Sequence, residues 1–160
     1  MLFRSIRFNA LFNLGPFGSR SLEGIISATQ IKLNGNFTAN VPIAGHNFSF
    51  ANASVTADNN GVKISGVIDL YFYKLQVSGN FYAANNFSLQ GQYNYNGTFV
   101  KTNMTVVVSA SKITIAGSGQ VFGPLGNQLY SGGLKFEPDW GNKSVRACYT
   151  ILSSEFCVQL

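Results

Sequence analysis

The chain has 160 residues, of which 46% are hydrophobic and only 11% are charged. This length is typical of one domain, and the hydrophobic fraction is sufficient for a sizeable core. The net charge of +5 comes from lysines and arginines scattered along the sequence, whereas nucleic-acid binding needs clustered cations that follow a phosphate backbone. No apolar run in the sequence reaches the length of a membrane-spanning helix. We therefore expect one domain that binds no nucleic acid and has no transmembrane segment.

The first 21 residues predict an irregular entry segment. Residues 1–5, MLFRS, resemble what a sequencing-adapter end would encode, so we expect them to be an artefact of gene truncation. Residues 6–21 contain Gly15, Pro16 and Gly18 and lack the continuous apolar region and cleavage site of a signal peptide. We expect residues 22–160 to form a single β domain, the C-terminal part of a longer protein whose signal peptide has been lost by the truncation.

A pattern of alternating apolar and polar residues with a glycine in its middle recurs five times, in IKLNGNF, VKISGVI, LQVSGNF, FSLQGQY and KITIAGSG. Strict alternation of apolar and polar residues predicts half-buried strands. The glycines share the parity of the apolar residues and should therefore face the core: Gly35, Gly66, Gly79, Gly91 and Gly117. Weaker copies are centred on Asn52 and Met104. A mid-strand glycine column of this kind is typical of a strongly bent sheet, or of aromatic rings packed on bare backbone.

Turn signals divide the rest of the chain into short strands. We expect strands near 22–33, 35–42, 46–56, 62–72, 75–83, 87–95, 98–109, 112–121, 129–136, 144–151 and 155–159. The connections are too short for parallel crossovers, so consecutive strands should pair antiparallel. The predicted fold is all-β: an antiparallel meander of about 9–11 strands in one strongly curved sheet or barrel-like roll. The alternative is a β-solenoid.

The apolar parity changes between Ile64 and Phe81. Ile64, Ile68 and Leu70 have even numbers, whereas Leu75 and Phe81 have odd ones. A parity change requires a tight turn or a bulge. We favour a turn near Tyr73 and Lys74, because an unbroken strand of that length would be unusual.

The two cysteines, Cys148 and Cys157, flank a predicted hairpin. If Leu152 and Ser153 form its tip, residues whose numbers sum to 305 face each other, and the two cysteines satisfy this condition. We expect a structural disulfide; two buried free thiols or a redox pair are the alternatives. The spacing is not that of a metal site, because a second cysteine pair and a nearby histidine are both lacking.

Seven Asn-x-Ser or Asn-x-Thr sequons give a second indication of compartment. They begin at Asn36, Asn47, Asn52, Asn86, Asn96, Asn103 and Asn142. Strand faces built of Asn, Ser and Thr also produce sequons by composition alone, so their use as glycosylation sites is a hypothesis. With the cysteine pair they favour an extracellular or cell-surface location.

Residues suited to catalysis are scarce. The one histidine, His46, lies in a predicted turn, and Asp69 is an acid between two apolar residues that should face outward. The stretch Asp58–Gly61 lacks the remaining ligands of a calcium loop, and the glycines after Gly117 lack a phosphate-binding spacing. We therefore expect no catalytic residues, no metal and no cofactor.

The remaining candidate for function is the outward face of the sheet. Its predicted contact residues are uncharged and polar: Gln76, Ser78, Asn80, Ser88, Gln90 and Gln92. We expect a non-catalytic extracellular module with a structural or adhesive role, whose partner is a glycan, a surface or another copy of the chain. The alternative is a carrier that holds a lipid or other hydrophobic ligand inside the coiled sheet. An interior filled by aromatic rings would favour the first function, and a cavity lined by them the second.

Overall fold

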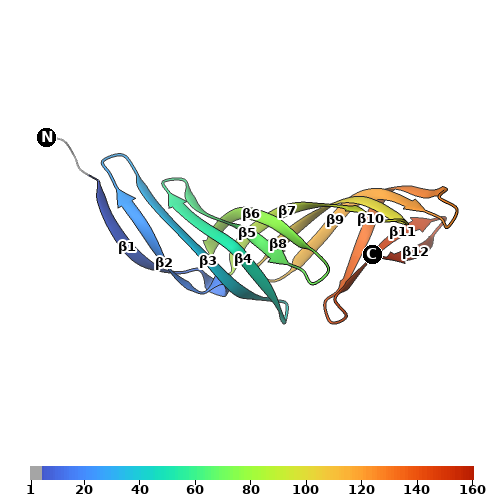
Figure 1. The fold of residues 1–160 in the computed structure, drawn as a ribbon, viewed down its shortest axis with the longest axis horizontal. Coiled ribbons are helices and arrows are strands. Elements are labelled where there is room, and N and C mark those ends of the chain that lie inside the picture. Colours follow the sequence, from blue (N-terminus) through green and yellow to red (C-terminus); the bar gives the residue numbers. More distant parts are fainter. Residues whose placement is uncertain (1–4) are drawn as a thin grey trace.

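A computed structural model describes residues 5–160, and all twelve of its strands belong to one antiparallel sheet (Figure 1). Each strand pairs with its neighbours in the sequence, in the order β1 to β12. The strands are β1 (Ile6–Asn13), β2 (Ser19–Ile26), β3 (Ile31–Ile43), β4 (His46–Asp58), β5 (Gly61–Asp69), β6 (Lys74–Ala83), β7 (Asn86–Asn96), β8 (Val100–Ser109), β9 (Ile113–Phe122), β10 (Gln128–Asp139), β11 (Ser144–Ile151) and β12 (Ser154–Gln159). The predicted all-β antiparallel meander is confirmed, and the antiparallel pairing excludes a parallel solenoid.

The N-terminal part of the prediction is corrected. The supposedly irregular residues 6–21 form β1, the short 3₁₀ helix η1 (Gly15–Phe17) and the start of β2. β1 alternates like the later strands, with Phe8, Ala10 and Phe12 on its less exposed side, and Gly15 and Pro16 supply only the turn. Residues 1–4 of the suspected artefact lie outside the described residues.

The division between the second and third strands is also different from the prediction. The turn lies at residues 27–30, where the Ser27 N–H donates to the Gln30 carbonyl, and β3 then runs unbroken through Gly35. Here Gly35 occupies the middle of a strand, as the repeat itself implies, and does not mark a strand end.

The parity change after β5 is a tight turn, as predicted. β5 ends at Asp69 and β6 begins at Lys74, while the Leu70 N–H donates to the Tyr73 carbonyl. The Asp69 carboxylate accepts a hydrogen bond from the Tyr71 N–H and lies 3.8 Å from the Lys74 ammonium. The core side chains of both strands therefore face the same side of the sheet.

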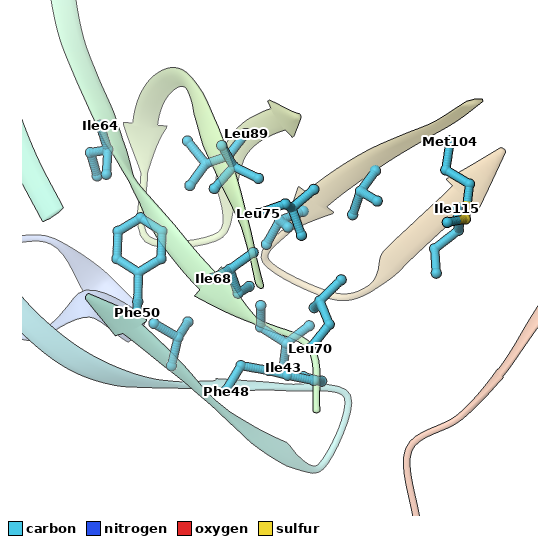
Figure 2. Close-up of a cluster of buried hydrophobic side chains, with 14 of the residues drawn as sticks. Ile43, Phe48, Phe50, Ile64, Ile68, Leu70, Leu75, Leu89, Met104 and Ile115 are labelled. Atoms are coloured by element: carbon cyan, nitrogen blue, oxygen red, sulfur yellow. The ribbon is translucent and has the colours of Figure 1, made fainter. Parts of the chain in front are cut away.

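The sheet curls into a half-barrel around its apolar face. Figure 2 shows side chains of β3 to β9 gathered on this inner side, among them the fully buried Ile64, Ile68 and Leu89. The end strands β1 and β12 pair with β2 and β11 and not with each other, so the roll is open among the described residues. Burial of this continuous apolar face is the main favourable term in folding.

Two glycines show why the strands can approach so closely. A Cβ atom at Gly79 would lie 1.9 Å from the Ser88 carbonyl oxygen of β7, and one at Gly117 would lie 2.1 Å from the Asn103 carbonyl oxygen of β8. The glycine column is staggered, because Gly79 faces Leu89 and Gly117 faces Met104 in the strand register. Each glycine thus leaves space beside a larger core residue of the next strand.

Aromatic rings join parts of the roll that are distant in sequence. The Phe17 ring, held by η1, lies 5.1–6.4 Å from the rings of four other phenylalanines: Phe37, Phe50, Phe81 and Phe87. In the turn between β10 and β11, Trp140 stacks on Phe72 at 5.5 Å and meets the Phe48 ring edge-on at 5.1 Å. We call Trp140, Phe72 and Phe48 the clasp, because they hold the last strands against β4 and the β5–β6 turn.

The two cysteines form the predicted disulfide. Cys148 on β11 is opposite Cys157 on β12, and their sulfur atoms are bonded. The hairpin tip is the predicted one, since Leu152 and Ser153 both have positive φ angles, as the central residues of a tight hairpin turn require. The disulfide attaches the short edge strand β12 to the sheet.

Candidate functional site: an uncharged polar sheet face

Ionisable side chains are concentrated at the C-terminal end of the sheet, around Glu137 of β10. The Glu137 carboxylate accepts hydrogen bonds from Lys135 and Arg146, and Lys135 also lies 3.9 Å from Glu155. The hydrogen bonds from Lys135 and Arg146 lower the pKa of Glu137, and those from Asn142 lower the pKa of Asp139. These groups satisfy one another, which is typical of a structural ion-pair network.

The histidine and the acid considered in the sequence, His46 and Asp69, have different surroundings. His46 shares an open hollow with Asp139, Trp140 and Arg146, but the carboxylates of that hollow are already bound by Arg146 and Asn142. Asp69 is bound by its own turn and by Lys74. The acids beside His46, and Asp69 itself, thus already have hydrogen-bonding or charged partners.

The predicted contact residues lie together on the outer face of β6 and β7. All six side chains are exposed: Gln76, Ser78, Asn80, Ser88, Gln90 and Gln92. The strand register places Ser78 opposite Gln90 and Asn80 opposite Ser88. Side chains opposite each other on antiparallel strands lie about 5 Å apart, so these residues form one patch.

Four residues of this patch, Ser78, Gln90, Asn80 and Ser88, belong to two polar rows that cross many strands. One row runs through β3 to β7 and consists of Asn36, Ser54, Ser65, Ser78 and Gln90. The other runs from β2 to β8 and consists of Glu23, Asn34, Thr56, Lys63, Asn80, Ser88 and Ser109. Within the first row, the Ser54 and Ser65 hydroxyls share a hydrogen bond of 2.8 Å. Along these rows the outer face presents mainly amides and hydroxyls, with Glu23 and Lys63 as the two charged residues.

Comparison of the chain with known protein families, with curated proteins and with solved structures finds no match.

The β4 residues of these rows, Ser54 and Thr56, were missed in the sequence because β4 contains a bulge. Its register shifts between Ala51 and Ser54, where Asn52 has a φ of +49°. Phe48 and Phe50 before the bulge and Val55 after it are all buried, although their parity differs. The signal that could have found the bulge was this parity change inside an otherwise regular strand.

All seven sequon asparagines are exposed: Asn36, Asn47, Asn52, Asn86, Asn96, Asn103 and Asn142. Asn36 lies within the first polar row, and Asn96 and Asn103 lie on the outer face of β7 and β8. Exposure is required for an attached glycan, and a disulfide-bonded β domain is compatible with an extracellular location. No helix within residues 5–160 has the length and apolar character to cross a membrane.

Proposed function

We propose that this chain is a non-catalytic extracellular module with a structural or adhesive role, and that it makes its contacts through the outer sheet face. The observation that carries the proposal is the pair of uninterrupted polar rows, five and seven strands long. A regular array of exposed amides and hydroxyls can donate and accept hydrogen bonds with low desolvation cost compared with charged groups.

The packing of the interior supports this role better than the carrier role. Phe17 lies within ring-to-ring contact of four other phenylalanines, and Tyr73 and Tyr93 stack at 4.3 Å. These rings pack against one another on the inner face, whereas a carrier of a hydrophobic molecule needs an apolar cavity there. Native mass spectrometry should accordingly give the mass of the chain without an extractable lipid; a reproducible lipid adduct would favour the carrier.

Adhesion of coated beads tests the proposal. Beads carrying the purified chain are applied to a mucin layer, to a layer of the same chain and to bare glass, and detachment force is measured. We expect a higher detachment force on at least one of these two layers than on bare glass. The double variant Ser78→Glu with Gln90→Glu, which puts two carboxylates into the middle of the face, should reduce it several-fold, because a partner that covers the face must then desolvate two charged groups.

A matched control carries the same added charge elsewhere. Leu125→Glu with Gln128→Glu changes two exposed residues, one in the β9–β10 turn and one at the start of β10. A role of this face would be contradicted if the unaltered chain adhered to both layers no more strongly than to glass. It would also be contradicted if the two double variants lost adhesion equally.

A further inference from the structure

Two hollows on the outer face have the same arrangement of side chains. The first, of about 450 Å³, lies over β4, β5 and β6, and we call its six outward residues the first grid: Ser54, Thr56, Lys63, Ser65, Ser78 and Asn80. The second, of about 470 Å³, lies over β7, β8 and β9, and its outward residues form the second grid: Asn94, Asn96, Lys101, Asn103, Ser118 and Gln120. Each grid takes two residues from each of three neighbouring strands.

The strand register makes the correspondence between the grids explicit. Lys63 on the middle strand of the first grid is opposite Thr56 on one side and Asn80 on the other. Lys101 on the middle strand of the second grid is opposite Asn96 and Gln120 in the same way. The second row of each grid is uncharged: Ser54, Ser65 and Ser78 in the first, and Asn94, Asn103 and Ser118 in the second.

Each hollow therefore has one lysine on its middle strand, beside five side chains that carry hydroxyls or amides. The Lys101 ammonium lies 5.4 Å from the centre of the Phe122 ring at the edge of the second grid. None of the described residues that line either hollow is acidic, and Lys63 and Lys101 take part in none of the ion pairs within residues 5–160. Lysine on a sheet often protects an edge strand from pairing. That role does not apply to Lys63 and Lys101, because β5 and β8 are paired on both sides.

The dimensions of the grids limit the ligand. Neighbouring strands are about 4.8 Å apart and alternate residues on one strand about 7 Å apart, so a grid covers about 10 Å by 7 Å. This area suits one or two sugar rings. A saccharide hydroxyl both donates and accepts, as amides and hydroxyls do, and one carboxylate would pair with the lysine ammonium group. A phosphate backbone would instead need several cations together.

We propose that each grid binds an acidic sugar unit, and that the module thereby binds an acidic polysaccharide. This inference rests on the proposed function and names the partner of the same face. Lys63 and Lys101 supply the charge recognition, and the flanking amides and hydroxyls orient the sugar. Two sites on one chain raise the overall affinity for a polymer above that of either site alone.

The test uses polygalacturonate as the acidic polymer and its methyl-esterified form as the matched neutral polymer. The chain is produced in a host that does not N-glycosylate, because Asn96 and Asn103 of the second grid begin sequons. We expect binding to polygalacturonate and little to the ester. Lys63→Gln and Lys101→Gln should each weaken binding by about fivefold or more, and the double variant should abolish it.

The control for charge alone is Lys112→Gln in the β8–β9 turn, which removes the same charge from an exposed residue outside both grids. It should leave the affinity within about twofold. An equal loss in Lys112→Gln, or equal binding of the methyl ester, would overturn the inference. The inference would also be overturned if inorganic sulfate competed with polygalacturonate as strongly as galacturonate oligomers do, because each grid would then be a general anion site. Bead adhesion that persists without any polygalacturonate binding would refute the inference and leave the proposed function standing.

Discussion

At the scale of single residues, the aromatic side chains of this protein are placed by specific partners as well as by burial. Tyr73 is the clearest case, because its ring stacks on Tyr93 and its hydroxyl donates to the Met104 sulfur at 3.1 Å. Burial, with smaller contributions from Tyr93 and Tyr95, raises the pKa of Tyr73 well above its usual value of 10.0. The sequence indicated an aromatic core but could not pair these rings, since Tyr73, Tyr93 and Met104 lie on different strands or turns.

The raised pKa of Tyr73 predicts a loss of stability in alkali. In the folded chain Tyr73 holds its proton more tightly than in the unfolded chain, so its contribution is complete below pH 10 and declines as the pH rises further. Tyr73→Phe should change the free energy of unfolding near neutral pH by about 1 kcal/mol or less, and should unfold less readily than the unaltered chain at about pH 11. Urea unfolding at both pH values measures this.

The control is Tyr82→Phe, which removes a hydroxyl from a side chain that is 71% exposed. It should lose as much free energy of unfolding in alkali as the unaltered chain does. If Tyr73→Phe also lost as much, the assignment to Tyr73 would be refuted.

At the scale of strands, periodicity predicted most elements but failed where a strand contains a local irregularity. β5 to β9 follow the repeat closely. β4 does not, because the bulge at Asn52 moves its core residues from even to odd numbers. β1 was missed because Gly15, Pro16 and Gly18 outweighed the alternation that precedes them, although they form only a turn.

The close approach at Gly79 gives an element-scale prediction. Gly79→Ala should lower the free energy of unfolding by about 1–3 kcal/mol or more, because its Cβ would overlap the backbone of β7. Gly133→Ala on β10 is the control, since a Cβ there would meet no atom within 4 Å. It should be neutral or slightly stabilising, by reducing the entropy of the unfolded chain. Chemical denaturation compares the two, and equal effects would argue against the close approach.

The disulfide gives a second prediction at this scale. Replacing both cysteines, by Cys148→Ala and Cys157→Ser, should cost about 2–3 kcal/mol in the chain-entropy description, because the closed loop is short. Hydrogen exchange should show the loss of protection first in β12, which is an edge strand held by β11 alone. Loss of protection spread evenly over all strands would contradict this order.

At the scale of the whole molecule, the last strands contact the middle of the sheet through residues that no local pattern brings together. The clasp brings the β10–β11 turn against β4 and the β5–β6 turn, and the Lys143 ammonium lies 5.6 Å from the centre of the Tyr71 ring beside it. These contacts join residues that are about 70 to 90 positions apart in the sequence. We expect them to help hold the sheet in its half-barrel curl.

Removing the clasp should therefore open the roll as well as destabilise it. Trp140→Ala should lower the free energy of unfolding by about 3 kcal/mol, since the stacked and edge-on contacts are lost together. Small-angle X-ray scattering should show a larger radius of gyration for the folded variant. Trp140→Phe, which keeps an aromatic ring at this position, should retain most of both properties. An unchanged radius in Trp140→Ala would mean that the β-sheet twist alone sets the curl.

The sequence by itself determined the all-β class, the meander, the glycine positions, the parity turn and the cysteine pair. Each of these follows from alternation or from turn geometry between neighbours in the chain, and such signals are local. The tertiary structure decided the openness of the roll, the clasp and the alignment of polar side chains into rows and grids. The rows depend on strand register across many strands, and one bulge in β4 changes which residues face outward, so only the paired sheet specifies that surface.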